Sequence, residues 1–152
     1  MSTLHVDKTE VWKDIPGYEG SCQVSTFGRV KSVSRIRKTS LKGSSICSTI
    51  KGKIKKQWLK QGYPMVSLTK NGGDKNFPVH RLVLMTFIGP CPEGMECRHL
   101  DGVRTNNTPD NLAWGTDFEQ YEDAVRHGTH FTVTTTHEER VAISKKAREV
   151  YM

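Results

Sequence analysis

The chain has 152 residues, of which 35% are hydrophobic and 26% are charged. That length suffices for one ordinary domain, or for two small modules that share a modest core. No stretch approaches the roughly 18 apolar residues of a membrane span, and the N-terminus lacks the cationic start and apolar run of a signal peptide. We therefore expect a soluble, globular protein with a cytoplasmic location.

The charge of the chain is distributed very unevenly. The formal net charge is +7 and the pI is about 9.3. Between Arg29 and Arg81 there are 14 lysine or arginine residues and a single acid, Asp74, whereas between Leu82 and His127 three basic residues stand against eight acids. Lysine and arginine that displace counterions supply most of the non-specific affinity for nucleic acid. The basic half of the chain therefore favours a nucleic-acid partner.

The cysteine spacing argues against a metal-bound or disulfide-bonded framework. None of the four cysteines forms the C-x-x-C pair of a zinc ribbon, and without a secretory signal a disulfide framework is not expected either. We expect reduced, partly buried thiols, so a structural zinc is disfavoured. A zinc shared by Cys91 and Cys97 with a distant histidine is the alternative.

Residues 10–70 are predicted to form a small antiparallel β module. Apolar and polar residues alternate there over short runs that glycine interrupts, as in half-exposed strands. The pattern predicts strands at 23–25, 29–33, 54–60 and 63–68, a hairpin turn at Asn71–Asp74 and a further strand that ends near His80.

Two further expectations concern the basic segment and the tryptophans. Residues 34–53 are rich in Ser, Lys and Gly without a clear period, so they are predicted to form a flexible basic loop. Trp12, Trp58 and Trp114 are expected to pack in the core, because small domains need large apolar side chains.

Beyond His80 the pattern predicts helices around a β-hairpin. Dense apolar residues favour a short buried helix from Leu82 to Ile88. A strand at 95–100, a turn at Asp101-Gly102 and a return strand at 112–114 predict the hairpin.

Two capping patterns predict the remaining helices. Thr116 and Glu119 form a capping box that opens a helix as far as about His127. Thr136 and Glu139 repeat the pattern for a second helix.

Several motifs in the second half of the chain follow one another in a fixed order. They are Val79–Val83, Gly89–Glu96, Arg98–Gly102, Asn106-Asn107, Pro109–Leu112 and Trp114–Thr116. As an ordered series, they resemble the HNH (His-Me finger) endonucleases common in phages. Residues 10–33 resemble the NUMOD-type segment that often precedes that domain.

The resemblance implies an α+β fold with a DNA-binding segment before a nuclease core. The fold would be a small antiparallel β module, followed by a ββα-metal nuclease core and a C-terminal helix. The corresponding divisions are 10–70 for the basic DNA-binding segment, 76–130 for the nuclease core, and 131–152 for the linker and C-terminal helix. The resemblance also implies a phage-encoded or bacterial protein.

The implied reaction is hydrolysis of phosphodiester bonds in DNA. His99 matches the invariant histidine of the family and would act as general base on the attacking water, since a neutral imidazole accepts a proton near pH 7. Asn111 matches the middle asparagine, whose amide ties the hairpin loop together and so aims the histidine. Arg98 stands where many relatives have Asp or His as a metal ligand. It cannot bind a cation and is expected to contact a phosphate oxygen in the catalytic site.

The resemblance also implies one divalent cation. Oxygen ligands combined with phosphate and water suit Mg²⁺ or Mn²⁺. Gln120 is the expected ligand, at a position where the family mostly has His or Asn, and Asp101 is the alternative. The departures at Arg98 and Gln120 leave open a catalytically weak or inactive DNA-binding protein on the same scaffold.

DNA is the expected partner, contacted mainly through its backbone. The residues expected to make these contacts are Arg29, Lys31, Lys53, Lys55, Lys56 and Arg81. One core would nick a single strand, whereas a homodimer could cut both, and the sequence leaves both possibilities open. An RNA-binding or ribosome-associated protein would explain the charge but not the ordered motifs.

Overall fold

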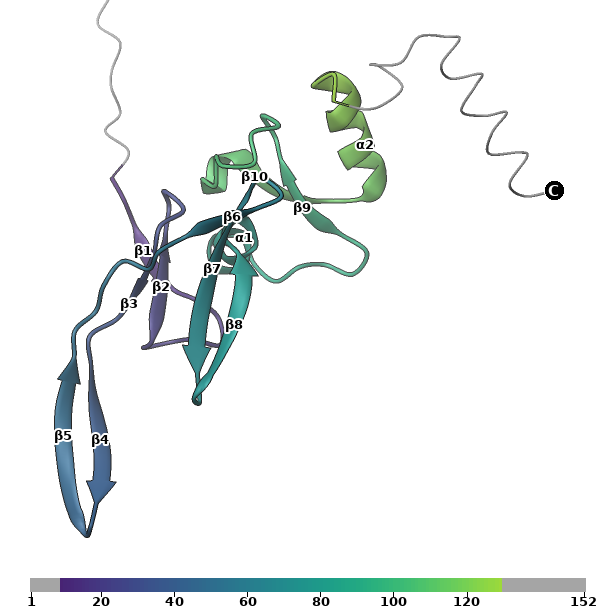
Figure 1. Cartoon of the computed structure of the whole chain (residues 1–152). Coiled ribbons are helices and arrows are strands. Elements are labelled where there is room, and N and C mark those ends of the chain that lie inside the picture. Colours follow the sequence, from purple (N-terminus) through teal and green to yellow (C-terminus); the bar gives the residue numbers. More distant parts are fainter. Residues whose placement is uncertain (1–8, 130–152) are drawn as a thin grey trace, which may run out of the picture.

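The computed structural model describes residues 9–129 of the chain. The linker and helix predicted at 131–152 lie outside the described residues. The N-terminal part folds into two small antiparallel sheets (Figure 1). The first contains β1 (Trp12–Asp14), β2 (Cys22–Ser25) and β3 (Val30–Ser32), and the second contains β6 (Trp58–Lys60), β7 (Tyr63–Lys70) and β8 (Gly73–Pro78). Each sheet has its middle strand flanked by its two neighbours in the chain.

The segment between these sheets is an ordered hairpin, so the prediction of a flexible loop at 34–53 is wrong. The strands β4 (Arg35–Leu41) and β5 (Ser44–Ile50) pair in antiparallel register from Arg35↔Ile50 to Leu41↔Ser44. The hairpin projects away from the rest of the molecule (Figure 1), and nearly all of its residues are exposed. Because neither face is buried, no apolar alternation marks these strands in the sequence.

Helix α1 (Val79–Phe87) lies at the centre of the fold. It begins three residues earlier than predicted, because Pro78 ends β8 with φ −66° and ψ 133° and serves as the N-cap. A proline in this position closes the strand and leaves the next residues free to start a helix. His80, expected at a strand end, therefore lies in the first helical turn.

One hydrophobic core joins the two halves of the chain. The buried residues of α1 pack with side chains from β2, β3, β7 and the strand β10 (Leu112–Gly115). The core members are Ile15, Cys22, Val24, Val30, Val66, Leu68, Val79, Leu82, Val83, Leu84 and Leu112. Trp114 packs against this core and Trp12 is half-buried, but Trp58 is 39% exposed, so its expected core position is wrong.

The last described elements form a ββα unit. Strand β9 (Glu96–His99) pairs with β10, a short 3-10 turn, η1 (Pro109–Asn111), precedes β10, and α2 (Asp117–Arg126) follows it. The predicted capping box is confirmed, because Thr116 accepts a hydrogen bond from the Glu119 N–H and the Glu119 carboxylate accepts one from the Thr116 N–H. The α+β class is thereby confirmed. No helix in residues 9–129 is long and apolar enough to cross a membrane.

Candidate active site

His99 lies at the end of β9, inside a cluster of aromatic rings. Its ring centroid is 5.2 Å from that of His80 on α1 and 6.1 Å from that of Tyr63 on β7. Its Nε2 is 2.9 Å from Oδ1 of the buried Asn107, in the loop between β9 and β10. The half-buried His99 therefore contacts side chains from α1, from β7 and from the loop between β9 and β10.

Asn111 ties the loop of the β9–β10 hairpin together. Its side-chain oxygen accepts from the Asp101 N–H at 3.0 Å, and its Nδ2 donates to Asp101 Oδ1 at 2.8 Å and to the Asn106 carbonyl at 2.9 Å. Asn111 directly precedes Leu112, the residue that pairs with His99 across the β9–β10 hairpin. Asn111 thus has the geometry of a loop anchor beside the histidine.

The Asp101 carboxylate is engaged within the same loop. Besides Asn111, it accepts from the Val103 N–H at 2.8 Å and from Asn106 Nδ2 at 2.7 Å. Burial is the largest single influence on this carboxyl and raises its pKa. The hydrogen bonds, led by that of Asn106, outweigh it and hold the pKa of Asp101 below its ordinary value. Both oxygens of this alternative metal ligand therefore already serve the loop.

Arg98 joins β9 to α2 through a part-buried ion-pair network. Its Nε and Nη2 donate to the two oxygens of Asp123 at 2.7 and 2.9 Å, and its Nη1 lies 3.0 Å from Glu119 Oε1. The hydrogen bond from Arg98 is the main reason why the pKa of Asp123 is lowered. All three guanidinium nitrogens thus have carboxylate partners on α2, a network that was not predicted from the sequence.

Gly115 makes room for this network. A Cβ at Gly115 would lie 2.4 Å from Cδ of Arg98 and 3.1 Å from Glu119 Oε2. Only glycine leaves the Arg98 stem space to reach α2 along β10.

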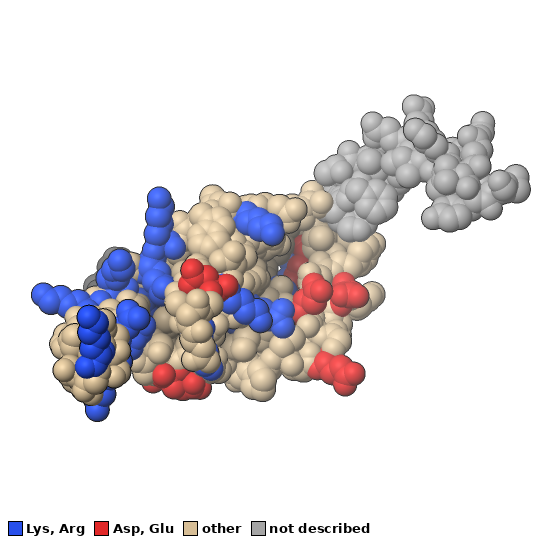
Figure 2. Space-filling view, turned by 60° about the horizontal axis from the view of Figure 1, so that its bottom comes forward, with Lys and Arg blue, Asp and Glu red and all other residues tan. Residues whose placement is uncertain are grey.

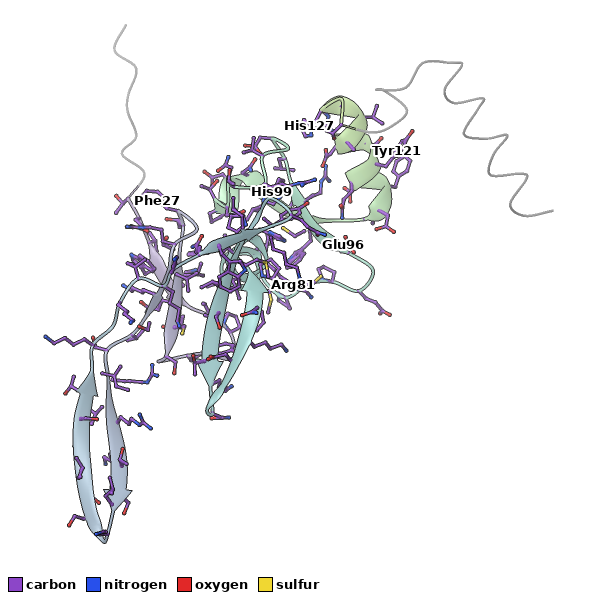
Figure 3. All side chains as sticks on the ribbon, in the orientation of Figure 1. Phe27, Arg81, Glu96, His99, Tyr121 and His127 are labelled. Carbon is purple, nitrogen blue, oxygen red and sulfur yellow. The ribbon has the colours of Figure 1, made fainter. Side chains whose placement is uncertain are left out.

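Gln120 lies on α2 facing the hairpin. Its Nε2 donates to Oε2 of Glu96, the exposed first residue of β9, at 3.2 Å. Together with His99 and Arg98, it lines a cavity of about 380 Å³ between the hairpin, α2 and Tyr63. Figure 3 labels Glu96 and His99, the first and last residues of β9, together with Arg81 of α1. Glu96 was missed in the sequence, although its alternation with Arg98 along β9 puts both on the strand face that meets α2.

His80 and Arg81 extend the site from α1. Burial, assisted by the neighbouring His99 and Arg81, lowers the pKa of His80 to about 4, so its imidazole is neutral at pH 7. Its Nδ1 is buried without a hydrogen-bond partner in the described part of the chain. Arg81 is exposed and lines a second cavity, of about 300 Å³, with Glu96 and Gln120. Arg81 therefore lies beside the His99 site rather than with the other basic residues.

The site offers few protein ligands for a metal ion. Within residues 9–129 no group of three or more His, Cys, Asp or Glu side chains could hold one. Gln120, which lines the same cavity as His99, offers an amide oxygen, and its hydrogen-bond partner Glu96 offers a carboxylate. Such oxygen donors fit a hard cation that shares its ligands with phosphate and water. Burial raises the pKa of the Cys97 thiol to about 12.

The other basic residues that were predicted to bind DNA lie around the sheet formed by β1, β2 and β3. Lys31 of β3 bridges to Ile54, so the chain around Lys53 and Lys55 lies along that strand. Lys31 Nζ sits 4.2 Å from the ring centroid of Trp12, and Arg29, over the same ring, is ion-paired with Glu10. Lysine and arginine concentrate toward the hairpin end of the molecule, whereas the acids form scattered patches, several of them toward the opposite end (Figure 2).

Comparisons with known proteins agree with this arrangement. Residues 10–69 match the NUMOD4 motif and residues 77–120 match the HNH endonuclease model. DNA endonuclease I-HmuI of Bacillus phage SP01 is 39% identical over 118 residues, which are 78% of this chain and 59% of that protein. The SPbeta prophage-derived putative HNH homing endonuclease YosQ of Bacillus subtilis (strain 168) is 40% identical over 68 residues, covering 44% of this chain and 39% of that protein.

A solved structure shows the same fold. The structure entitled "DNA binding and cleavage by the HNH homing endonuclease I-HmuI" aligns with a TM-score of 0.64 and 34% identity, over 89% of this chain and 66% of that one. The chain spans 59% of the length of I-HmuI itself. From its two consecutive family matches and its likeness to I-HmuI in sequence and fold, the chain belongs to the HNH endonuclease family and carries a NUMOD4 motif before its HNH core.

Proposed function

We propose that the protein is a DNA endonuclease that hydrolyses phosphodiester bonds with His99 as general base. The observation that carries the proposal is the shared cavity of about 380 Å³, in which the hairpin and α2 bring together His99, Arg98 and Gln120. Family membership supports it, since the similar protein I-HmuI is named a DNA endonuclease. We propose residues 76–130 as the nuclease core and residues 10–70 as the DNA-binding segment.

In this proposal each side chain has a defined task. His99 takes a proton from the attacking water, which is worth on the order of 10²–10⁴-fold in rate. Asn111 and Asp101 keep the hairpin loop, and with it His99, in a fixed geometry. Arg98 holds α2 against β9, so that Gln120 stays near His99, and the exposed Arg81 contacts a phosphate beside the site.

We further propose that Mg²⁺ or Mn²⁺ binds at Gln120 with Glu96 beside it. Such a cation offsets the charge that develops on the phosphate and on the leaving oxygen. Because Asp101 and Asp123 use their oxygens in other contacts, DNA and water would supply the remaining ligands. Cation binding in the absence of DNA is therefore expected to be weak.

The basic residues of the N-terminal segment would bind the phosphates of the DNA backbone. Those proposed are Arg29, Lys31, Lys53, Lys55 and Lys56, which lie on or alongside β3. Their contacts would be electrostatic and independent of sequence, since they meet phosphates rather than base edges.

Incubation with supercoiled plasmid in Mg²⁺, in Mn²⁺ and in EDTA tests the proposal. The wild type is expected to convert plasmid to nicked or linear DNA with either cation and to leave it intact in EDTA. Nicked product alone would indicate one strand cut per encounter, and linear product from the outset would indicate a homodimer.

The second candidate is an inactive DNA-binding protein on the same scaffold. It is favoured by Arg98, whose guanidinium is ion-paired with α2 where relatives have a metal ligand. Plasmid that is retarded in a gel but never cut, with either cation, would establish this candidate and refute the endonuclease.

A further inference from the structure

The N-terminal segment touches the nuclease core at one very close contact. Gly28, in the turn between β2 and β3, is buried and has φ +74°. A Cβ placed on Gly28 would lie 2.9 Å from Cβ of Asn107 and 3.0 Å from the Asn107 carbonyl oxygen. These neighbours are a Cβ and backbone, which cannot swing aside like the end of a flexible side chain. The two segments are therefore in direct contact at these two residues.

The turn that carries Gly28 is firmly held. Its N–H donates to the Ser25 carbonyl at 3.0 Å, and its own carbonyl accepts from Gln57 Nε2 at 2.8 Å. The fully buried Ser25 accepts from the N–H groups of Phe27 and Arg29 through its hydroxyl. These hydrogen bonds fix the backbone of the turn that packs against Asn107.

On its other side Asn107 meets His99. The residue is 4% exposed, and its Oδ1 lies 2.9 Å from His99 Nε2. A carbonyl oxygen can only accept, so this bond requires the single proton of the neutral imidazole to sit on Nε2. The lone pair of Nδ1 is then left to take a proton. With the proton on Nδ1 instead, the bond to Oδ1 and the free Nδ1 lone pair would both be lost.

We propose that Asn107 is a positioning residue that fixes the tautomer of His99, and that the Gly28 turn holds Asn107 in place. The N-terminal segment would then serve the nuclease core directly, in addition to any contact with DNA. The catalytic meaning of this inference rests on the proposed function, whereas the tautomer itself does not.

Two alanine substitutions at left-handed glycines separate this contact from general backbone strain. Gly28→Ala places a Cβ against Asn107. Gly20→Ala is the matched control, because Gly20 has φ +70° and a Cβ there would meet nothing within 4 Å. We expect Gly28→Ala to cleave plasmid about tenfold more slowly than Gly20→Ala in single turnover, since small displacements of a base are costly. DNA affinity should be the same for both.

A spectroscopic measurement tests the tautomer independently of cleavage. The ¹⁵N shifts of the His99 ring, recorded at about pH 8, where imidazole is ordinarily neutral, should show Nε2–H in the wild type and in Gly20→Ala. Asn107→Leu removes the acceptor and should give a tautomer mixture. Asn107→Asp keeps an acceptor oxygen and should retain Nε2–H, which a merely structural role for Asn107 would not explain.

Some outcomes overturn the inference without touching the proposed function. A wild-type His99 protonated on Nδ1, an unchanged tautomer in Asn107→Leu, or equal cleavage rates for the two glycine variants would each do so. If Gly28→Ala fails to fold, the two Asn107 variants still decide through the ring shifts. Conversely, a wild type that cleaves no DNA refutes the proposed function and leaves the tautomer measurement valid.

Discussion

Replacement of Arg98 by methionine should destabilise the fold more than any exposed ion pair could. The side chains of Arg98 and Asp123 are only 14% and 8% exposed, and two bonds of 2.7 and 2.9 Å join them. Arg98→Met would leave the Asp123 carboxylate buried, with the Arg126 guanidinium 3.3 Å away as a partly compensating cation. Breaking a buried pair typically costs about 3–5 kcal/mol. Because Arg126 compensates in part, we expect about 3 kcal/mol, a large share of the roughly 5–15 kcal/mol of a typical domain.

Urea unfolding at pH 7 measures this loss. Arg126→Met is the matched control, because Arg126 is 62% exposed and its pair with Asp123 should be worth less than about 1 kcal/mol. The double variant Arg98→Met/Asp123→Leu removes both charges and should be more stable than Arg98→Met alone. If Arg98→Met lost no more stability than Arg126→Met, the network between β9 and α2 would be an ordinary surface pair and the reasoning would fail.

Three further predictions concern the metal, the DNA and pH. If Gln120 is the main metal ligand, Gln120→Asn should keep or improve cleavage. Gln120→Ala should lose most of it and recover partly in excess Mn²⁺ by mass action, and wild-type cleavage by this variant in limiting Mg²⁺ would move the ligand to another residue. Neutralising Lys53, Lys55 and Lys56 together should reduce the salt dependence of DNA binding by a log–log slope of about 0.9 per lost phosphate contact, and an unchanged slope would show that these lysines are only solvated. His80 has a folded pKa of about 4 and an unfolded pKa near 6.5. The unfolded state therefore binds a proton at a higher pH than the folded state does, and stability should fall by about 3 kcal/mol as the pH drops through this window. His80→Gln should remove that component from a urea series, and an identical pH dependence in this variant would contradict it.

The turns illustrate how much of the fold was predictable. Asn71 and Gly72 both have positive φ, as their sequence indicated. Lys42 and Gly43 adopt the same conformation, with φ +48° and +82°, in the hairpin that was mistaken for a loop. Asparagine carries a known preference for this conformation and lysine does not. With both faces of that hairpin exposed, no hydrophobic pattern compensated for the missing turn signal.

The candidate site divides in the same way. His99, Asn111 and Gln120 were predicted as site residues from their spacing in an ordered motif. The partners of His99 and Arg98 were not, because Asn107 and Asp123 reach them only through the folding of the hairpin and α2. Asp123 lies one helical turn after Glu119, so it shares the face of α2 that meets β9. Nothing in the sequence indicated which basic residue that face would bind.

Single-turnover plasmid cleavage by wild type and His99→Ala, with DNA affinity measured in parallel, tests the central claim most directly. A general base contributes on the order of 10²–10⁴-fold to the rate but makes no contact that holds the DNA backbone. We therefore predict that His99→Ala loses at least a hundredfold in rate, in line with that range, with its DNA affinity unchanged. A variant that cleaves at the wild-type rate would contradict the assignment of His99 as the catalytic base.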